Sequence, residues 1–174
     1  AEPGGAPLTA RGDMNDQLPG DHRASARRAR WVWLAWLAVA LIAVVTYWPG
    51  LGGDFWFDDN ANIVRNAAVK IQSLRVSDLL QAWGSSLDPF PRSRPLAMLT
   101  FGVNHAVGGL DPFGFKLTNL LLHVVTGTLL FVTLSAMATQ YLSLEGRGRA
   151  DSASPQWWAL FAAALWLLHP LQVS

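Results

Sequence analysis

The chain has 174 residues, a formal net charge of +1 and 14% charged residues, against about 25% in soluble globular proteins. It contains no cysteine, which excludes a disulfide framework, a thiolate metal site and a thiol nucleophile. The near-neutral charge argues against a nucleic-acid partner. Nine tryptophans and apolar residues gathered in a few blocks suit lipid better than water, so we expect an integral membrane protein.

The first apolar block predicts a membrane-spanning helix. Residues 31–48, WVWLAWLAVALIAVVTYW, carry no charge, and about 20 residues cross the hydrocarbon core as a helix. Aromatic side chains at both ends suit the headgroup boundary. The alternative is a signal peptide, but the run is longer than a signal core and no small-residue cleavage motif follows it.

Arginine placement predicts how the chain is threaded. Four arginines directly precede the first apolar block, and short Arg-rich segments stay in the cytoplasm. Because the chain starts without Met and stops in an apolar run, we expect a fragment of a longer protein. The expected organisation is a disordered cytoplasmic tail at 1–30, a transmembrane helix at 31–48, an extracytoplasmic loop at 49–116, a second transmembrane helix at 117–142, a cytoplasmic loop at 143–156 and a third, truncated transmembrane helix at 157–174.

The long outer loop carries helix signals of its own. Ser77 is expected to cap a short helix that Gly84 stops, with Asp78 in its first turn. Pro95 suits the first position of a second helix, which packs on the bundle or lies along the membrane interface. The fold class is therefore expected to be all-α, with multi-pass transmembrane helices and a large helical extracytoplasmic loop.

Two adjacent carboxylates, Asp58 and Asp59, follow the first span closely. Such a pair points apart into solvent, binds a cation or supplies a general base. A solvated turn is the ordinary interpretation of a DD pair. Here Phe55, Trp56 and Phe57 hold the pair near the membrane surface, where ionisable groups tend to be functional. We therefore expect a catalytic role for both.

Basic and polar residues recur at the same membrane boundary. Arg92 and Arg94 stand before the second loop helix, where a guanidinium can bind a lipid phosphate, anchor to headgroups or pair with a loop aspartate. Lys116, Asn119 and His123 share one face of the second span.

His169 falls at a similar depth on the third span. Hydrogen bonding between helices is the alternative role for such polar groups. The convergence of acids and bases predicts a site for a charged headgroup, with Arg94, Lys116 and His169 on the lipid phosphate.

Three stretches together resemble a known family. DFWFDDNANI, SRPLAMLTFGVNHAVGGLDPFGFKLTNLLLH and WWALFAAALWLLHPLQVS are similar to the N-terminal part of bacterial membrane proteins with C-terminal tetratricopeptide repeats. Those proteins resemble the transmembrane and tetratricopeptide-repeat-containing O-mannosyltransferases of animals, in the GT-C class of glycosyltransferases. The resemblance implies the N-terminal part of a GT-C-like bundle in the bacterial inner membrane.

The resemblance also implies an activity and its partners. It implies transfer of a sugar from a polyprenyl-phosphate donor to a hydroxyl of an acceptor protein or glycan, with Asp58 at the acidic position and His169 in a His-Pro motif. No metal ligands are assigned, and the cofactor is undetermined, with a divalent cation as the candidate. The alternative is a non-catalytic membrane anchor for the repeats.

Overall fold

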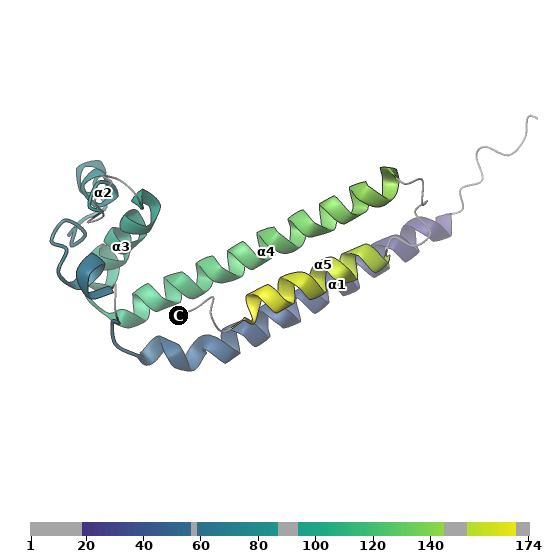
Figure 1. Cartoon of the computed structure of the whole chain (residues 1–174), viewed down its shortest axis with the longest axis horizontal. Coiled ribbons are helices and arrows are strands. Elements are labelled where there is room, and N and C mark those ends of the chain that lie inside the picture. Colours follow the sequence, from purple (N-terminus) through teal and green to yellow (C-terminus); the bar gives the residue numbers. More distant parts are fainter. Residues whose placement is uncertain (1–18, 57–58, 87–93, 145–152, 170–174) are drawn as a thin grey trace, which may run out of the picture.

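The computed structural model describes residues 19–56, 59–86, 94–144 and 153–169, and every regular element among them is helical. Figure 1 shows three helices running side by side, α1 (Pro19–Tyr47), α4 (Pro112–Leu144) and α5 (Ala153–Leu167), with two shorter helices, α2 and α3, gathered at one end. The all-α expectation is confirmed for these residues.

The core of the bundle is built where the three long helices meet. Trp36 of α1 stacks on Phe131 of α4 with ring centroids 5.1 Å apart, and its indole Nε1 donates to Thr128 Oγ1 at 3.2 Å. Gly127 of α4 allows α5 to lie close, since a Cβ at that position would be 2.8 Å from Cδ1 of Leu167 on α5. A small residue at a helix crossing is the usual means of close packing between membrane helices.

Two helical segments are long and apolar enough to cross a membrane. One is Ala26–Gly52, 27 residues that include most of α1 and the 3₁₀ turn after it, and the other is Pro112–Leu144, the 33 residues of α4. Only 17% and 22% of their apolar windows are buried in the structure, whereas the core helix of a soluble protein is mostly buried. Their outward faces carry large exposed side chains such as Leu41 and Leu129. These faces are suited to contact with lipid.

The helix boundaries differ from the expected spans. Helix α1 begins at Pro19, so the second part of the segment expected as a disordered tail is helical. Ala and Arg are strong helix formers, and the sequence SARRAR lengthens the apolar helix toward its N-terminus. Residues 1–18 lie outside the described part of the chain.

The third apolar block forms a shorter helix than a full crossing requires. Helix α5 has 15 residues, or about 22 Å at 1.5 Å per residue, and it ends at Leu167. A third crossing through 174 therefore stays a prediction, since residues 170–174 lie outside the described part.

The loop between α1 and α4 has a small core of its own. After a 3₁₀ turn (Trp48–Gly52) and a π-helical turn (Asn60–Val64), helix α2 (Val76–Trp83) packs against α3 (Pro95–Gly108). A Cβ on Gly102 of α3 would lie 2.7 Å from the Cβ of Ala82 on α2. The buried side chains around this crossing are Ile63, Val69, Ile71, Ala82 and Met98.

The end signals of the loop helices were partly right. Helix α3 has Pro95 in its first turn, as predicted, and it ends at Gly108, with Gly109 at φ +66° as its C-cap. The prediction that Ser77 caps α2 is wrong, because Arg75 holds the N-cap position and makes no side-chain cap bond. The Ser77 hydroxyl instead donates to Asp78 at 3.1 Å.

Candidate functional site

The acidic segment emerges from the end of α1 through a turn that fixes Asp59. The backbone N–H of Trp56 donates to Asp59 Oδ2 at 3.2 Å, and the Asp59 N–H donates to the Trp56 carbonyl at 2.9 Å. The ring of Phe55 meets Phe115 of α4 edge-on, with centroids 5.4 Å apart. Asp58, the other predicted catalytic residue, lies outside the described residues together with Phe57.

Lys116 ties the start of α4 to the end of α1. Its Nζ donates to the carbonyl oxygen of Gly50 at 3.3 Å. Gly53 leaves the room for this contact, because a Cβ at that position would lie 2.7 Å from Nζ. The predicted phosphate ligand is thus half-buried at the base of the loop that carries Asp59.

His169 lies at the opposite side of the same junction, directly after α5. The hydroxyl of Tyr47, the last residue of α1, lies 3.2 Å from the His169 carbonyl and 3.3 Å from the Leu167 carbonyl. The His169 residue is exposed. Its backbone is therefore anchored to α1.

The polar residues predicted to share one face of α4 differ in how far they are buried. His123 is buried, and its Nε2 lies 2.8 Å from the Leu167 carbonyl. Because a carbonyl oxygen only accepts, Nε2 carries the hydrogen. The imidazole also contacts the Trp166 ring at 4.8 Å between centroids, whereas Asn119 is exposed. His123 thus joins two helices, as the structural alternative held.

Arg94 occupies the N-cap position of α3, and its carbonyl accepts a hydrogen bond from the Met98 N–H at 3.0 Å. Its side chain is exposed. Phe101 on the same helix contacts Phe115 of α4, with centroids 6.1 Å apart. Arg94 therefore stands on a helix that is fixed to the first turns of α4. Arg92 lies outside the described residues.

The described contacts bring two of the predicted site residues to one place, the junction at the end of α1. Lys116 reaches it through Gly50 and His169 through Tyr47. Tyr47 was interpreted from the sequence only as a boundary aromatic. A hydroxyl near the end of the apolar run was the signal for its second role, because a partly buried phenol seeks a hydrogen-bond partner.

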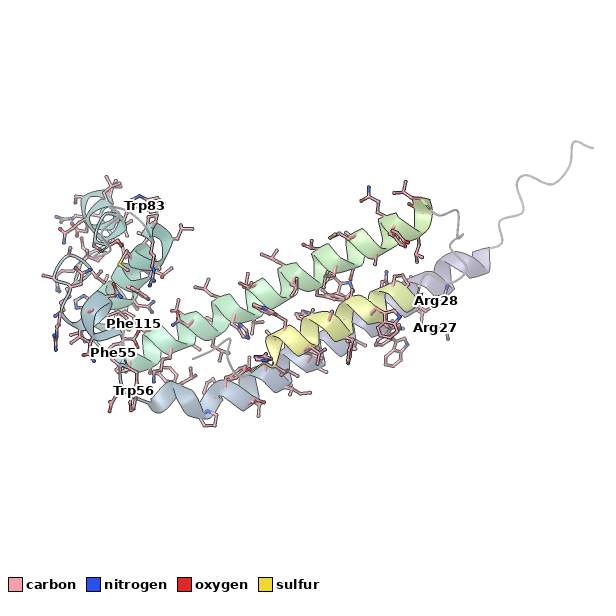
Figure 2. The ribbon with its side chains drawn as sticks, in the orientation of Figure 1. Arg27, Arg28, Phe55, Trp56, Trp83 and Phe115 are labelled. Atoms are coloured by element: carbon pink, nitrogen blue, oxygen red, sulfur yellow. The ribbon has the colours of Figure 1, made fainter. Side chains whose placement is uncertain are left out.

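Among the described residues, no three His, Asp or Glu side chains gather closely enough to hold a metal ion. Figure 2 shows Arg27 and Arg28 at one end of the bundle and Phe55, Trp56 and Phe115 at the other.

Comparison with known proteins identifies a similar region. The chain is 34% identical to protein O-mannosyl-transferase TMTC4 of Homo sapiens over 143 residues, which cover 78% of this chain and 19% of that protein. It is 30% identical to protein O-mannosyl-transferase TMTC2 of Homo sapiens over 146 residues, which cover 79% of this chain and 15% of that protein.

The similarity extends to Drosophila melanogaster, whose protein O-mannosyl-transferase Tmtc1 is 29% identical over 119 residues, covering 66% of this chain and 14% of that protein. No family model and no solved structure matches the chain. The chain thus spans less than a fifth of the length of these relatives, and over that part it is similar to protein O-mannosyl-transferases.

Proposed function

We propose that this chain supplies part of the active site of a membrane glycosyltransferase that moves a sugar from a polyprenyl-phosphate donor to a hydroxyl, with protein Ser or Thr as the acceptor. The similarity to protein O-mannosyl-transferases over 78% of the chain carries the proposal. The two membrane-length helices support it, since a polyprenyl donor is held in the bilayer.

Asp58 and Asp59 act on the acceptor in this proposal. The acceptor oxygen forms a bond to the anomeric carbon, the bond from that carbon to the phosphate oxygen breaks, and the electron pair leaves with the polyprenyl phosphate. The hydroxyl proton passes to a carboxylate. The two hydrogen bonds between Trp56 and Asp59, one of them to the carboxylate itself, support this role, because they hold the carboxylate in a defined turn.

Arg94, Lys116 and His169 bind the departing phosphate in this proposal. An ammonium has three N–H donors, and the contact of Lys116 with Gly50 uses one of them. Fixed donors aimed at the charge that develops on a leaving group are the larger part of catalysis in such transfers. The joint position of Lys116 and His169 beside the end of α1 supports the assignment.

The proposed topology follows from the arginines that precede the apolar part of α1. Arg27, Arg28 and Arg30 are exposed on that helix, and we assign them to the cytoplasmic side of a bacterial inner membrane. The loop with Asp59 then faces outward. Donor lipid would be engaged from the outer leaflet.

The test is glycan transfer by the intact protein after Asp58→Asn or Asp59→Asn, with Asp54→Asn as the matched control, since Asp54 is an exposed carboxylate of the same loop. Loss of a general base lowers turnover by about 10²- to 10⁴-fold, so one of the two variants should lose that much and the control should not. Undiminished transfer in both variants would remove the carboxylates from the mechanism.

The anchor alternative has a separate readout. An anchor predicts that the unaltered protein neither binds a polyprenyl-phosphate sugar nor transfers it. Photo-crosslinking with a polyprenyl-phosphate mannose analogue measures binding independently of turnover. Binding without transfer by the aspartate variants would support the proposed enzyme, and absence of binding by the unaltered protein would favour the anchor.

A further inference from the structure

Helix α3 exposes an apolar stripe that no part of the described chain covers. Leu96, Val103 and Val107 recur at spacings of seven and four residues, which places them on one face of a helix. Val107 is 78% exposed and Leu96 is 68% exposed. Between Pro95 and Gly108 the helix has no Asp, Glu, Lys or Arg. This surface is poorly suited to water.

The other faces of α3 are occupied by protein contacts. Gly102 and Met98 face the loop core and α2. Phe101 meets Phe115, and Asn104 Oδ1 accepts a hydrogen bond from the Thr118 hydroxyl at 2.9 Å. These contacts fix α3 against the first two turns of α4, so the stripe faces away from both α2 and α4.

The first turn of α4 marks the end of the apolar span. Phe113 lies there beside Trp48, with ring centroids 6.2 Å apart, and Trp48 closes the apolar run of α1. Aromatic rings of this kind concentrate at the boundary between hydrocarbon and headgroups. With α4 spanning the membrane as proposed above, its contacts with α3 hold that helix at the level of this boundary.

We propose that α3 is an interfacial helix whose stripe of Leu96, Val103 and Val107 inserts into the outer leaflet of the membrane. Amphipathic helices in the interface bury their apolar face about 5–10 Å into the boundary between headgroups and acyl chains. Leu110 and Phe113, both partly exposed, follow the stripe along the chain from the end of α3 into the first turn of α4. This continuity with the lipid-facing surface of α4 favours lipid over a protein partner.

Arg94 at the start of the helix adds a matching charge. This exposed residue stands one position before α3, at the level where a guanidinium would meet the phosphate layer of the leaflet. The inference rests on the proposed span at α4 but not on glycosyl transfer. It would hold for an anchor as well as for an enzyme.

These 174 residues contain no cysteine, so a direct test needs no change among them beyond the labelled position, and any cysteine elsewhere in the intact protein is replaced by serine. Single-cysteine variants Val107→Cys, Ala67→Cys and Leu41→Cys of the intact protein are labelled with an environment-sensitive fluorophore and reconstituted in phosphatidylcholine and phosphatidylglycerol vesicles. Quenching by lipids with a nitroxide near the headgroup end of the acyl chain is then measured. Ala67 lies exposed in a loop turn, and Leu41 is exposed on the apolar part of α1.

We expect quenching at position 107 to be several-fold stronger than at position 67, and strongest with the shallow nitroxide. Position 41 should be quenched best by a nitroxide deeper in the chain. If position 107 is quenched no more than position 67 while position 41 is quenched, the span stands and the interfacial helix is refuted. If position 41 is also unquenched, the proposed span itself fails.

A protein partner on the stripe is distinguished by the same label. A partner would shield position 107 from a soluble iodide quencher without bringing it near the lipid nitroxide. That combination would overturn the proposal. Shielding from iodide together with nitroxide quenching would support it.

Discussion

The end of α5 offers a sharp test of how the three long helices are joined. The Leu167 carbonyl lies 2.8 Å from Nε2 of His123 and 3.3 Å from the hydroxyl of Tyr47. Carbonyls in the last turn of a helix have no partner within it. Two donors from two different helices therefore serve one acceptor, and each can keep it bonded when the other is removed.

This redundancy predicts that the two donors are not additive. Tyr47→Phe or His123→Leu alone should lower the free energy of unfolding by about 0.6 kcal/mol through the lost hydrogen bond, the average for such bonds in membrane proteins. The double variant also leaves the carbonyl unsatisfied, at a cost of about 1–3 kcal/mol. Its destabilisation should exceed the sum of the single effects by about 1 kcal/mol.

The assay is unfolding by sodium dodecyl sulfate in mixed micelles, followed by tryptophan fluorescence. Loss of the contact between His123 and Trp166 occurs in both the single and the double variant, so it cancels in the cycle. Thr126→Val is the control, because its exposed hydroxyl bonds only within α4, to the Leu122 carbonyl. Additivity within about 0.5 kcal/mol, the usual scatter for independent sites, would refute the shared-acceptor interpretation.

Two further predictions concern the outer loop. Gly102→Ala should destabilise the loop by about 1–3 kcal/mol through overpacking, because its Cβ would lie 2.7 Å from the Cβ of Ala82. Limited proteolysis should then cleave the loop of this variant faster than that of the unaltered protein. Gly108→Ala is the control, because a Cβ there meets nothing within 4 Å, and its loop should be cleaved at the unaltered rate. Hydrogen bonds to the carboxylate, first from Ser73 and then from Ser77, lower the pKa of Asp78; its contribution to stability is therefore present above its ordinary pKa and lost as the pH falls through the lowered value. Ser73→Ala should raise that pKa in an NMR titration, and an unchanged value would contradict the assignment.

The long helices could be predicted from the sequence because their signals are local. The uncharged run of α1 and the proline and glycines that bound α3 act within a few residues of where they stand. Their exact starts could not be predicted. Helix α4 begins at Pro112 rather than 117, since a proline in the first turn is compatible with a helix and the expected start followed Lys116 only because it is charged.

The cap of α2 shows a second limit. Ser77 is a good capping residue by type, but the Ser73 hydroxyl reaches forward to Asp78 at 2.5 Å. This bond engages the carboxylate in the first turn of the helix, and Arg75 is the N-cap. Propensity ranks residues one at a time, whereas the choice here depended on a pair five positions apart.

The sequence could place the polar residues of α4 on a helix face but could not predict which of them would be buried. Helical spacing correctly placed Lys116 and His123 on one side of α4, yet it could not predict that the end of α5 would cover His123 and leave Asn119 exposed. That outcome depends on α5 docking 44 residues further along the chain. The helical period predicts which face of the helix a residue occupies, but not which other segment covers that face.

Lys116, in the proposed site, also makes a contact that could not be predicted from the sequence. Its ammonium meets a backbone carbonyl 66 residues away, in a space that exists because Gly53 has no side chain. No local pattern links these positions. The contact nevertheless holds together the two ends of the loop between α1 and α4, so the segment with Asp59 leaves the end of α1 beside the first turn of α4. A lysine in that position can orient the acidic segment as well as bind a phosphate, and Gly53→Ala would disturb the first role by displacing Nζ while leaving the charge in place.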